Sequence, residues 1–508
     1  MYKELRNLNS SKSTGLDEVP ARFLKDAAIF LKLPITFIVN MSISENFVPE
    51  DMKVARVKPL YKKNSNLDVG NYRPVSILSI VSKILEKSVY VQFEKFLVDN
   101  QLLYELQSGF RNSYSTDTCL VHLMDHIRNN NAKGLYTGMI MLDLQKAFDT
   151  VDHHILCSKL KLMGVHNTEW FMSYLTGRKQ TVCVNDVFSE YKTVTCGVPQ
   201  GSILGPLLFL CYVNDMPISI DSQCKLILYS DDNAILFAHK DPNVISSKLG
   251  NVLESCSSWL VDNKLSLHLG KTECVMFGSK RKLKHVDDFK IVCNGHTIKS
   301  TQSVKYLGLN IDNTLSGETI VNNIVSKVNS RLKFLYRQAR FLDFKTRKYL
   351  CSALIQCHLD YSCSSWYPNL NRCLKNKLQI CQNKVVRFIN GMGPRESVNN
   401  HSLADMSLLN VESRNMQLRL NHVFKIVNDK CPSYMKENFK FVKNVHNCNT
   451  RSSLHNFSLP NNCGKDNVTF VYSAIKDWNA LPTNIKTVKS INKFKKSVKE
   501  HLLQRARK

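Results

Sequence analysis

The segment Lys225-Leu-Ile-Leu-Tyr-Ser-Asp-Asp-Asn-Ala-Ile-Leu-Phe237 is the most informative part of this chain of 508 residues. Two apolar runs flank Ser-Asp-Asp-Asn, and this pattern predicts a β-hairpin with acidic residues at its tip. A further apolar run, from Thr137 to Leu142, ends at Asp143 and predicts a buried strand. Apolar strands seldom end in acids without a cation to neutralise them, which suggests a bound metal ion. If the two strands are adjacent, Asp143 and Asp231 would lie in one metal-binding cluster.

The composition agrees with a globular protein that has an anionic partner. Hydrophobic residues make up 43% and charged residues 22%, which excludes whole-chain disorder, collagen and coiled coil. Lys and Arg number 69 against 42 Asp and Glu, a net charge of +27. A surplus of this size predicts a polyanionic partner, and the alternative is a merely soluble basic protein.

Acids on neighbouring strands of a basic protein suggest nucleotidyl transfer. Mg²⁺ prefers carboxylate and substrate phosphate oxygens. Two such ions about 3.5–4 Å apart clamp the attacking and leaving oxygens of an in-line phosphoryl displacement. The alternative remains open at this point, because Asp-Asp is also common in an ordinary hairpin turn.

Targeting signals and metal motifs are absent from the sequence. No apolar signal core or run of about 20 apolar residues occurs, so we expect an intracellular chain, in nucleus or cytoplasm, that is neither secreted nor membrane-bound. The seventeen cysteines form no C-x-x-C pair, which excludes zinc-ribbon and thioredoxin sites. His446, Cys448 and Cys463 fit no ligand spacing, and structural thiols are the favoured interpretation.

In the remaining chain, a mixture of helices and strands is predicted before Gly308, and helices are predicted after it. Its periodicity predicts helices within 16–48 and over 75–96 and 204–213, an extended stretch over 54–63, and hairpin strands over 180–184 and 189–195. Beyond Gly308, helices with basic polar sides are expected over 319–340, 345–358, 374–391 and 413–429. The end, 490–508, reads as a basic amphipathic helix with Phe494, Val498 and Leu502 on one stripe.

Three ordered blocks carry a family resemblance. Leu142-Asp-Leu-Gln-Lys-Ala-Phe-Asp149, Gly197-Val-Pro-Gln-Gly-Ser-Ile-Leu-Gly-Pro206 and Tyr229-Ser-Asp-Asp232 resemble motifs A, B and C of reverse transcriptases, specifically those of non-LTR retrotransposons of the jockey and CR1 kind. Four more blocks resemble the two finger motifs and motifs D and E: Asn71–Leu78, Gln107–Thr116, Leu265–Thr272 and Val304–Gly308.

The resemblance implies an α+β right-hand polymerase with fingers, a palm built on an antiparallel sheet, a helical thumb and a basic helical C-terminal region. The expected parts are an extension leading into the fingers (1–70), fingers and palm (71–310), a thumb-like region (311–430) and the basic region (431–508). The implied function is an RNA-directed DNA polymerase that adds dNTPs to a DNA primer on an RNA template. No protein partner is indicated.

The family also assigns roles to matching residues. Asp143 and Asp231 would hold two Mg²⁺ ions, with Mn²⁺ as an alternative metal, while Asp232 and the backbone carbonyl of Leu144 would assist. Lys271 would be the general acid for pyrophosphate, although it also fits a surface lysine.

Further residues would contact the nucleotide. Phe148 would lie under the sugar and exclude a ribose 2′-OH, although it also fits a core phenylalanine. Gln200, with Pro199 and Gly201, would contact the incoming nucleotide and template. Three cations, Arg73, Lys83 and Arg111, are candidates for gripping the triphosphate and template, and Arg73 and Arg111 alternatively brace the fingers.

The sequence departs from the family pattern at two points, of which the first, a single added hydroxyl, should be tolerated. The third motif has Ser230 where alanine is commoner, and nothing resembles the upstream endonuclease of these elements. The alternative function is therefore a catalytically inactive or domesticated nucleic-acid-binding remnant. An intron-type maturase is disfavoured, because the thumb and terminal blocks, including Trp478-Asn-Ala-Leu-Pro482, are retrotransposon-like.

Overall fold

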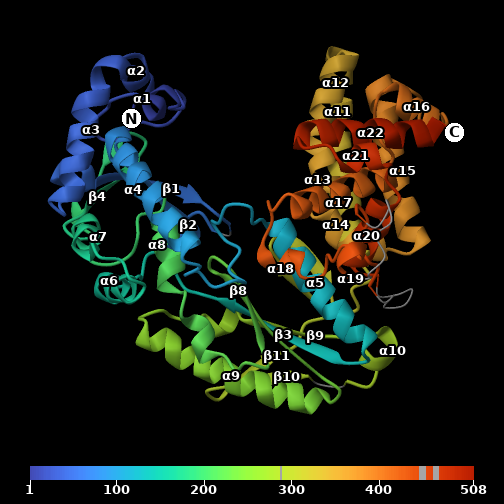
Figure 1. Cartoon of the computed structure of the whole chain (residues 1–508), viewed down its shortest axis with the longest axis horizontal. Helices are drawn as coiled ribbons and strands as arrows, with labels where there is room; N and C mark the ends of the chain where they lie inside the picture. Colours follow the sequence, from blue (N-terminus) through green and yellow to red (C-terminus); the bar gives the residue numbers. More distant parts are fainter. Residues whose placement is uncertain (64, 287–288, 446–453, 461–467, 508) are drawn as a thin grey trace. The chain divides into compact units, whose positions relative to one another are not determined.

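The computed structural model describes the chain except residues 64, 287–288, 446–453, 461–467 and 508, so His446, Cys448 and Cys463, for which a metal site was disfavoured, lie outside the described residues. The chain divides into two compact units, each assembled from separate stretches (Figure 1). The first unit comprises Met1–Phe110, Leu142–Ser222 and Val252–Lys271, and the second comprises Arg111–Met141, Gln223–Asn251 and Thr272–Lys508.

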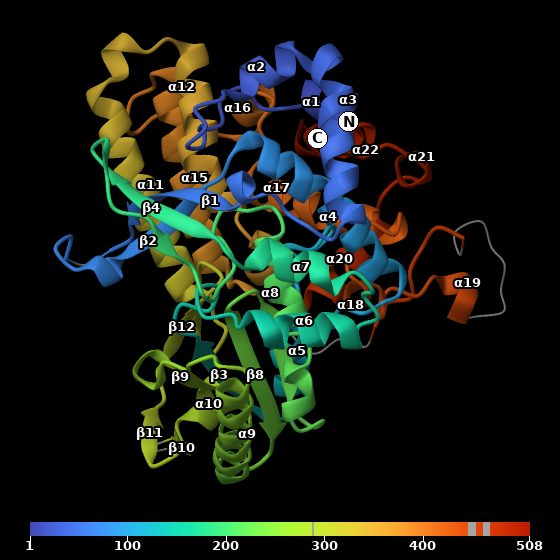
Figure 2. The same cartoon turned by 90° about the vertical axis from the view of Figure 1, so that its left-hand side faces the viewer.

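The first unit combines helices with one mixed sheet. Strand β1 (Val54–Tyr61) pairs antiparallel with β2 (Tyr72–Ile77) and parallel with β4 (Lys179–Val184), as Figure 2 shows. β4 also pairs with β5 (Val187–Phe188) and β6 (Lys192–Thr193). The helices are α1 (Tyr2–Arg6), α2 (Ala21–Asp26), α3 (Ala28–Ser44), α4 (Ile80–Asp99), α6 (His153–Leu162), α7 (Thr168–Leu175) and α8 (Gly205–Tyr212).

The predicted helix over 75–96 was wrong at its start. Residues 75–77 belong to strand β2, and α4 begins only at Ile80, with Ser79 as its N-cap. The physical reason is that Pro74 cannot donate within a helix and favours extended backbone before it, while Val75 and Ile77 pair with β1. The predicted strand over 180–184 and the buried helix over 204–213 are confirmed, whereas within 189–195 only Lys192–Thr193 form a strand, which pairs with β4.

The sheet of the second unit has the order β7-β8-β3-β9. Its strands are β3 (Tyr136–Asp143), whose last two residues belong to the first unit, β7 (Lys225–Tyr229), β8 (Asp232–His239) and β9 (Glu273–Phe277). β7 and β8 form the predicted antiparallel hairpin, and β3 is the predicted buried strand. Gly138 is required in β3, because an added Cβ would lie 2.4 Å from the side chain of Ile245 on helix α9 (Pro242–Asp262).

Helices dominate the rest of the second unit. Two small hairpins, β10 (Lys290–Cys293) with β11 (His296–Lys299) and β12 (Ser303–Tyr306) with β13 (Leu309–Asp312), precede them. The helices are α5 (Thr116–Ala132), α10 (Lys280–Leu283), α11 (Glu318–Arg337), α12 (Phe344–Cys351), α13 (Cys357–Asp360), α14 (Cys363–Trp366), α15 (Arg372–Asn390), α16 (Asn400–Asp405), α17 (Val411–Val427), α18 (Ser433–Lys436), α19 (Val442–Val445), α20 (Phe470–Asn479), α21 (Thr483–Lys486) and α22 (Ile491–Arg507).

The C-terminal helix has the predicted amphipathic character. Phe494, Val498 and Leu502 of α22 are buried, and Phe494 packs against Phe424 and Trp478. One predicted helix, 345–358, is instead divided by a π-helical turn at Ser352–Gln356 between α12 and α13.

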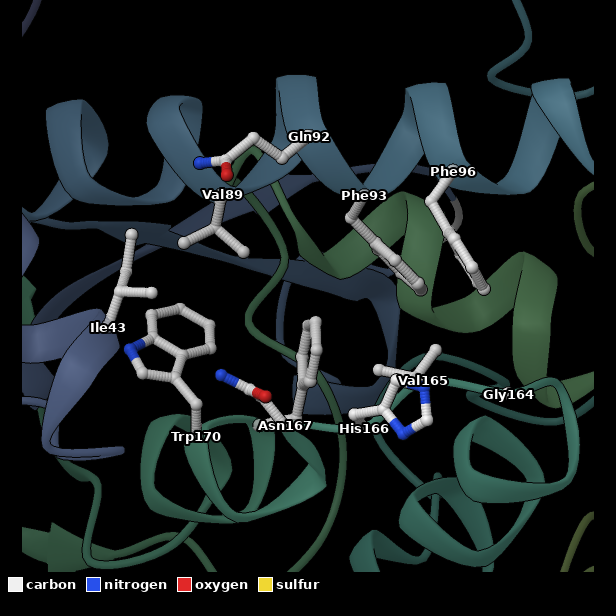
Figure 3. A pocket seen from close by; sticks show the side chains of 11 residues that line it. Ile43, Val89, Gln92, Phe93, Phe96, Gly164, Val165, His166, Asn167 and Trp170 are labelled. Atoms are coloured by element: carbon white, nitrogen blue, oxygen red, sulfur yellow. The ribbon is translucent and has the colours of Figure 1, made fainter.

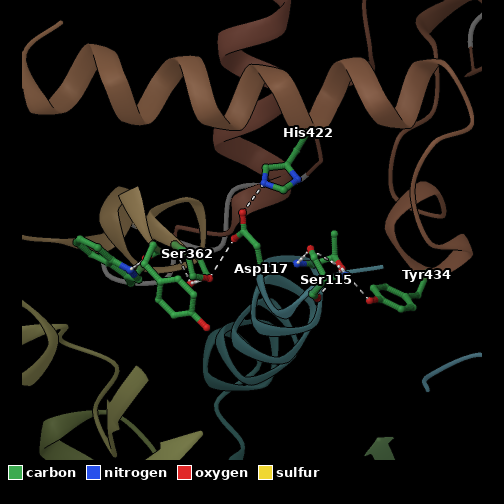
Figure 4. A network of polar contacts seen from close by, with 9 residues as sticks. Ser115, Asp117, Ser362, His422 and Tyr434 are labelled. Carbon is green, nitrogen blue, oxygen red and sulfur yellow. Dashed lines mark hydrogen bonds and ion pairs between the residues drawn. The ribbon is translucent and has the colours of Figure 1, made fainter. Parts of the chain in front are cut away.

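A buried polar network joins α5 to the later helices of the second unit (Figure 4). Asp117, in the first turn of α5, accepts hydrogen bonds from Ser362 Oγ at 3.0 Å and His422 Nε2 at 2.7 Å. Burial alone would raise the pKa of Asp117, but the charge and hydrogen bond of His422 hold it below its usual value. The ionised carboxylate therefore ties α5, α14 and α17 together.

Candidate active site

Asp143 is the last residue of strand β3, and backbone hydrogen bonds join this end of the strand to the segment 265–271. The backbone N–H of His268 donates to the carbonyl of Asp143 at 2.9 Å, and that of Gln145 donates to Ser266 at 2.9 Å. The Lys271 ammonium lies 3.8 Å from Asp143 Oδ2, and the two side chains are 60% and 48% exposed. Both groups are thus accessible to a substrate, and two residues predicted to act in catalysis are adjacent in space.

The backbone carbonyl of Leu144, a predicted metal ligand, is not used in pairing with the 265–271 segment. Leu144 and Leu267 form an isolated antiparallel bridge between the two hydrogen bonds just described. In such a non-hydrogen-bonded pair, neither residue directs its N–H or carbonyl toward the other strand. The Leu144 carbonyl therefore points away from the 265–271 segment.

The loop 197–205 is held against two other parts of the first unit. The N–H of Val198 donates to the Phe148 carbonyl at 2.8 Å, and the N–H of Ser76 donates to the Gln200 carbonyl at 2.7 Å. Gly201 has φ +118°, and a Cβ there would lie 2.5 Å from the carbonyl oxygen of Ser76. A glycine is required at this position because the loop crosses strand β2 so closely.

Gln200 is oriented by an acid that the sequence did not single out. Its Nε2 donates to Asp149 Oδ1 at 2.8 Å. Burial raises the pKa of Asp149, and the hydrogen bond from Gln200 opposes this shift. The hydrogen bond to Asp149 fixes the side chain of Gln200. The neighbouring Pro199 is half-buried.

Phe148 lies in a cluster of three aromatic rings. Its ring stacks on Phe209 with centroids 4.4 Å apart and meets Phe110 edge-on at 6.2 Å. No helix begins at Phe148, since residues 145–149 form turns and α6 starts at His153. The ring is half-buried, and its packing against Phe209 and Phe110 is compatible both with a steric barrier and with a core position.

The acids of the hairpin belong to the second unit. Asp231 follows Ser230, which has the left-handed φ of 62° that a two-residue turn requires, and Asp232 pairs with Tyr229. Asp232 is exposed and Asp231 is half-buried. Arg111 also lies in this unit, with its guanidinium 4.1 Å from the ring centroid of Tyr114.

The two remaining predicted cations lie in the first unit. Arg73 is exposed on β2, three residues before Ser76. Lys83 is half-buried on α4, and burial together with repulsion from Lys12 lowers its pKa. The predicted phosphate contacts of Arg73 and Lys83 stay predictions.

No preformed metal cluster is found among the described residues, and an apolar pocket of the first unit is lined by residues other than those predicted. Among the described residues, no group of three or more His, Cys, Asp or Glu is arranged to hold a metal ion. An apolar pocket of about 280 Å³ in the first unit is lined by Phe93, Phe96, Trp170 and others (Figure 3), and contains none of the predicted residues. Of the helices that the structure describes, none has the length and apolarity needed to traverse a bilayer.

Comparison with known proteins identifies the family of the central region. The model of the family "Reverse transcriptase (RNA-dependent DNA polymerase)" matches residues 61–311. These residues contain the strands, loops and acids described above, from β2 to β13, together with the 197–205 loop and the β7–β8 hairpin.

Two of the curated relatives come from mobile elements of Drosophila. The chain is 24% identical over 440 residues to "Probable RNA-directed DNA polymerase from transposon BS" of Drosophila melanogaster, covering 83% of this chain and 48% of that protein. It is 28% identical over 406 residues to "RNA-directed DNA polymerase from mobile element jockey" of Drosophila funebris, covering 77% of this chain and 43% of that protein. The chain thus spans less than half the length of these relatives.

A solved structure shows only a weak likeness. The chain has a TM-score of 0.35 and 15% identity to an apo telomerase from Candida tropicalis, over 56% of this chain and 58% of that one. This likeness is too weak to assign the fold.

Proposed function

We propose that this chain, which contains a reverse transcriptase domain of the non-LTR retrotransposon kind, is an RNA-directed DNA polymerase that adds dNTPs to a DNA 3′-OH on an RNA template. The observation that carries this proposal is the presence of Asp143, Asp231 and Asp232 at strand ends inside the matched region 61–311. In this proposal, the first unit supplies the fingers, the sheet of the second unit belongs to the palm, and α11 and its neighbours form the thumb.

The donor set suits Mg²⁺, with Mn²⁺ as an alternative. Mg²⁺ is commonly bound by one or two carboxylates, with waters and substrate phosphates completing its coordination, rather than by an all-protein cage. The half-exposed Asp143 and the acids of the hairpin, with the Leu144 carbonyl, fit this description. Two such ions, when bound, would neutralise charge on the attacking and leaving oxygens.

The chain's own residues would bind and orient the nucleotide. The ring of Phe148, held by Phe209, would occupy the space of a ribose 2′-OH and so select dNTPs. Gln200, oriented by Asp149, would contact the incoming nucleotide. Lys271 would donate a proton to the departing pyrophosphate, and the distance of 3.8 Å from its ammonium to Asp143 Oδ2 supports this role.

The thumb-like helices would contact the phosphates of template and primer. Helix α11 buries Ile320, Ile324, Val328 and Leu332, while its basic residues are exposed: Lys327, Arg331, Lys333 and Arg337. Contacts of this kind are independent of sequence and weaken with salt.

Primer extension tests the proposal. An RNA template with an annealed DNA primer, dNTPs and Mg²⁺ would be offered to the wild-type chain, to Asp231→Ala and to Asp262→Ala, a matched exposed aspartate at the end of α9. We expect extension by the wild type and by Asp262→Ala, and none by Asp231→Ala. Salt-sensitive RNA binding without extension by the wild type would overturn the proposal and favour a non-catalytic remnant.

A further inference from the structure

A buried carboxylate on helix α4 lies behind the 197–205 loop. Glu86 is 1% exposed, and its Oε2 accepts the backbone N–H of Ile203 at 2.6 Å. Its other oxygen, Oε1, accepts the hydroxyl of Tyr174 on helix α7 at 2.7 Å. One side chain therefore connects two helices to the loop that carries Gln200.

The surroundings of Glu86 hold it in this position. Tyr174 is fully buried, stacks on Trp170 at 5.6 Å between ring centroids, and its hydroxyl also interacts with Ser202. The buried guanidinium of Arg178 lies 5.0 Å from the Tyr174 ring centroid and donates to the Tyr174 carbonyl at 3.0 Å. Burial raises the pKa of Glu86, and its hydrogen bonds and the charge of Arg178 oppose that shift.

Burial of the Glu86 side chain has a cost in folding free energy. A carboxylate removed from water destabilises the fold unless hydrogen bonds compensate for its lost hydration. Here one of those bonds is made to a loop amide rather than to a neighbouring helix, so part of the compensation depends on the loop being in place. The carboxylate and the loop therefore stabilise each other.

Glu86 completes a three-point attachment of the loop. The 148–151 turn holds its beginning through the N–H groups of Gly197 and Val198, and strand β2 holds its middle at Gln200. Glu86 holds the next turn, three residues beyond Gln200. Without this third contact, the N–H of Ile203 would lose its partner and the backbone after Gln200 would be free to shift.

We propose that Glu86, braced by Tyr174, is a positioning residue that fixes the loop 197–205 and thereby the nucleotide-contacting side chain of Gln200. This inference rests on the proposed function, because it assigns Glu86 to the dNTP site of that polymerase. It acts through the loop and does not touch the substrate.

The test compares dNTP kinetics of four forms of the full chain. Glu86→Met keeps the volume and removes both acceptors, whereas Glu86→Gln keeps an acceptor for Ile203, and Glu190→Gln is a control at an exposed glutamate. We expect Glu86→Met to raise the KM for dNTP at least tenfold with unchanged affinity for template–primer. Glu86→Gln should stay within threefold of the wild type, as should the control.

If Glu86→Met does not fold, Tyr174→Phe takes its place, because it removes one bond to the same carboxylate, and we expect the KM for dNTP to rise about threefold. An unchanged KM in the folded variant overturns the inference.

Hydrogen exchange at the Ile203 amide separates this inference from the proposed function, because it needs no activity. Failure of the wild type to extend a primer would overturn the function, whereas exchange in Glu86→Met as slow as in Glu190→Gln would overturn the attachment. We expect the exchange to be at least tenfold faster in Glu86→Met.

Discussion

The amide of Gln200 donates to the carboxylate of Asp149 at 2.8 Å, across 51 residues of sequence. Asp149 ends the block that begins with Leu142, and Gln200 lies in the loop that would contact the nucleotide. The bond links these two blocks directly, so the position of Gln200 depends on an acid that binds neither nucleotide nor metal in our proposal.

The first prediction concerns this pair. Asp149→Leu should raise the KM for dNTP about tenfold, which corresponds to about 1.4 kcal/mol, because Gln200 loses the acceptor that orients it. Asp149→Asn retains an Oδ1 acceptor and should change the KM by less than about threefold. Steady-state primer extension measures both values. Equal KM values for the two variants would show that the bond does not orient Gln200.

The second prediction concerns sugar selection by Phe148. Phe148→Val should increase incorporation of rNTPs relative to dNTPs by about tenfold or more, because the shortened side chain leaves room for a 2′-OH. The measurement is the ratio of kcat/KM for matched rNTP and dNTP on one template. The matched control is Phe209→Val, since Phe209 stacks on Phe148 but would not itself meet the sugar. A larger change in Phe209→Val would mean that the ring has only a packing role.

The third prediction distinguishes proton donation by Lys271 from an electrostatic effect of its positive charge. Lys271→Leu should lower kcat about 100-fold at unchanged dNTP KM, as expected for loss of a general acid. Lys271→Arg keeps the charge but cannot release a proton, so it should also be slow. The control is Lys264→Leu, because Lys264 is an exposed lysine directly before the 265–271 segment and forms an ion pair with Asp152 at 2.6 Å. Wild-type kcat in Lys271→Arg would leave Lys271 with an electrostatic role alone.

Sequence patterns predicted those residues whose position is marked by their neighbours in the sequence. Asp143, the Asp231–Asp232 tip and the amphipathic stripe of α22 follow from periodicity and were found in the expected strands and helix. Asp149 and Glu86 could not be found in that way. Their roles arise from hydrogen bonds to residues 51 and 117 positions away, and a lone acid on an apolar helix carries no pattern that names its partner.

The fourth prediction concerns pH and the buried His122. Burial, with repulsion from Lys225 and His126, lowers the pKa of His122 from 6.5 to about 3, and the neutral ring lies 3.0 Å from the Lys225 ammonium. Below pH 6.5 the unfolded chain binds a proton that the folded chain does not, so stability falls as pH decreases toward 3. Between pH 7 and 5.5 this site should cost about 1 kcal/mol.

The variant His122→Gln keeps an acceptor for Lys225 and cannot titrate. Its free energy of unfolding should therefore decline less steeply between pH 7 and 5.5 than that of the wild type, by about 1 kcal/mol. Urea titrations at the two pH values measure the difference. Parallel declines in the two proteins would show that His122 is charged in the folded state.

The last prediction concerns the close approach of Gly201 to strand β2. Gly201→Ala should destabilise the chain by about 2–5 kcal/mol, since the new Cβ meets a backbone carbonyl and the backbone is left-handed as well. Gly295→Ala isolates the second effect, because Gly295 has φ +75° with nothing within 4 Å of an added Cβ, and it should cost only about 1 kcal/mol. Urea unfolding and dNTP KM would be measured for both variants. If Gly201→Ala costs no more than Gly295→Ala and leaves KM unchanged, the loop has room to move away from β2, and the attachment at Ser76 does not hold Gln200 in place.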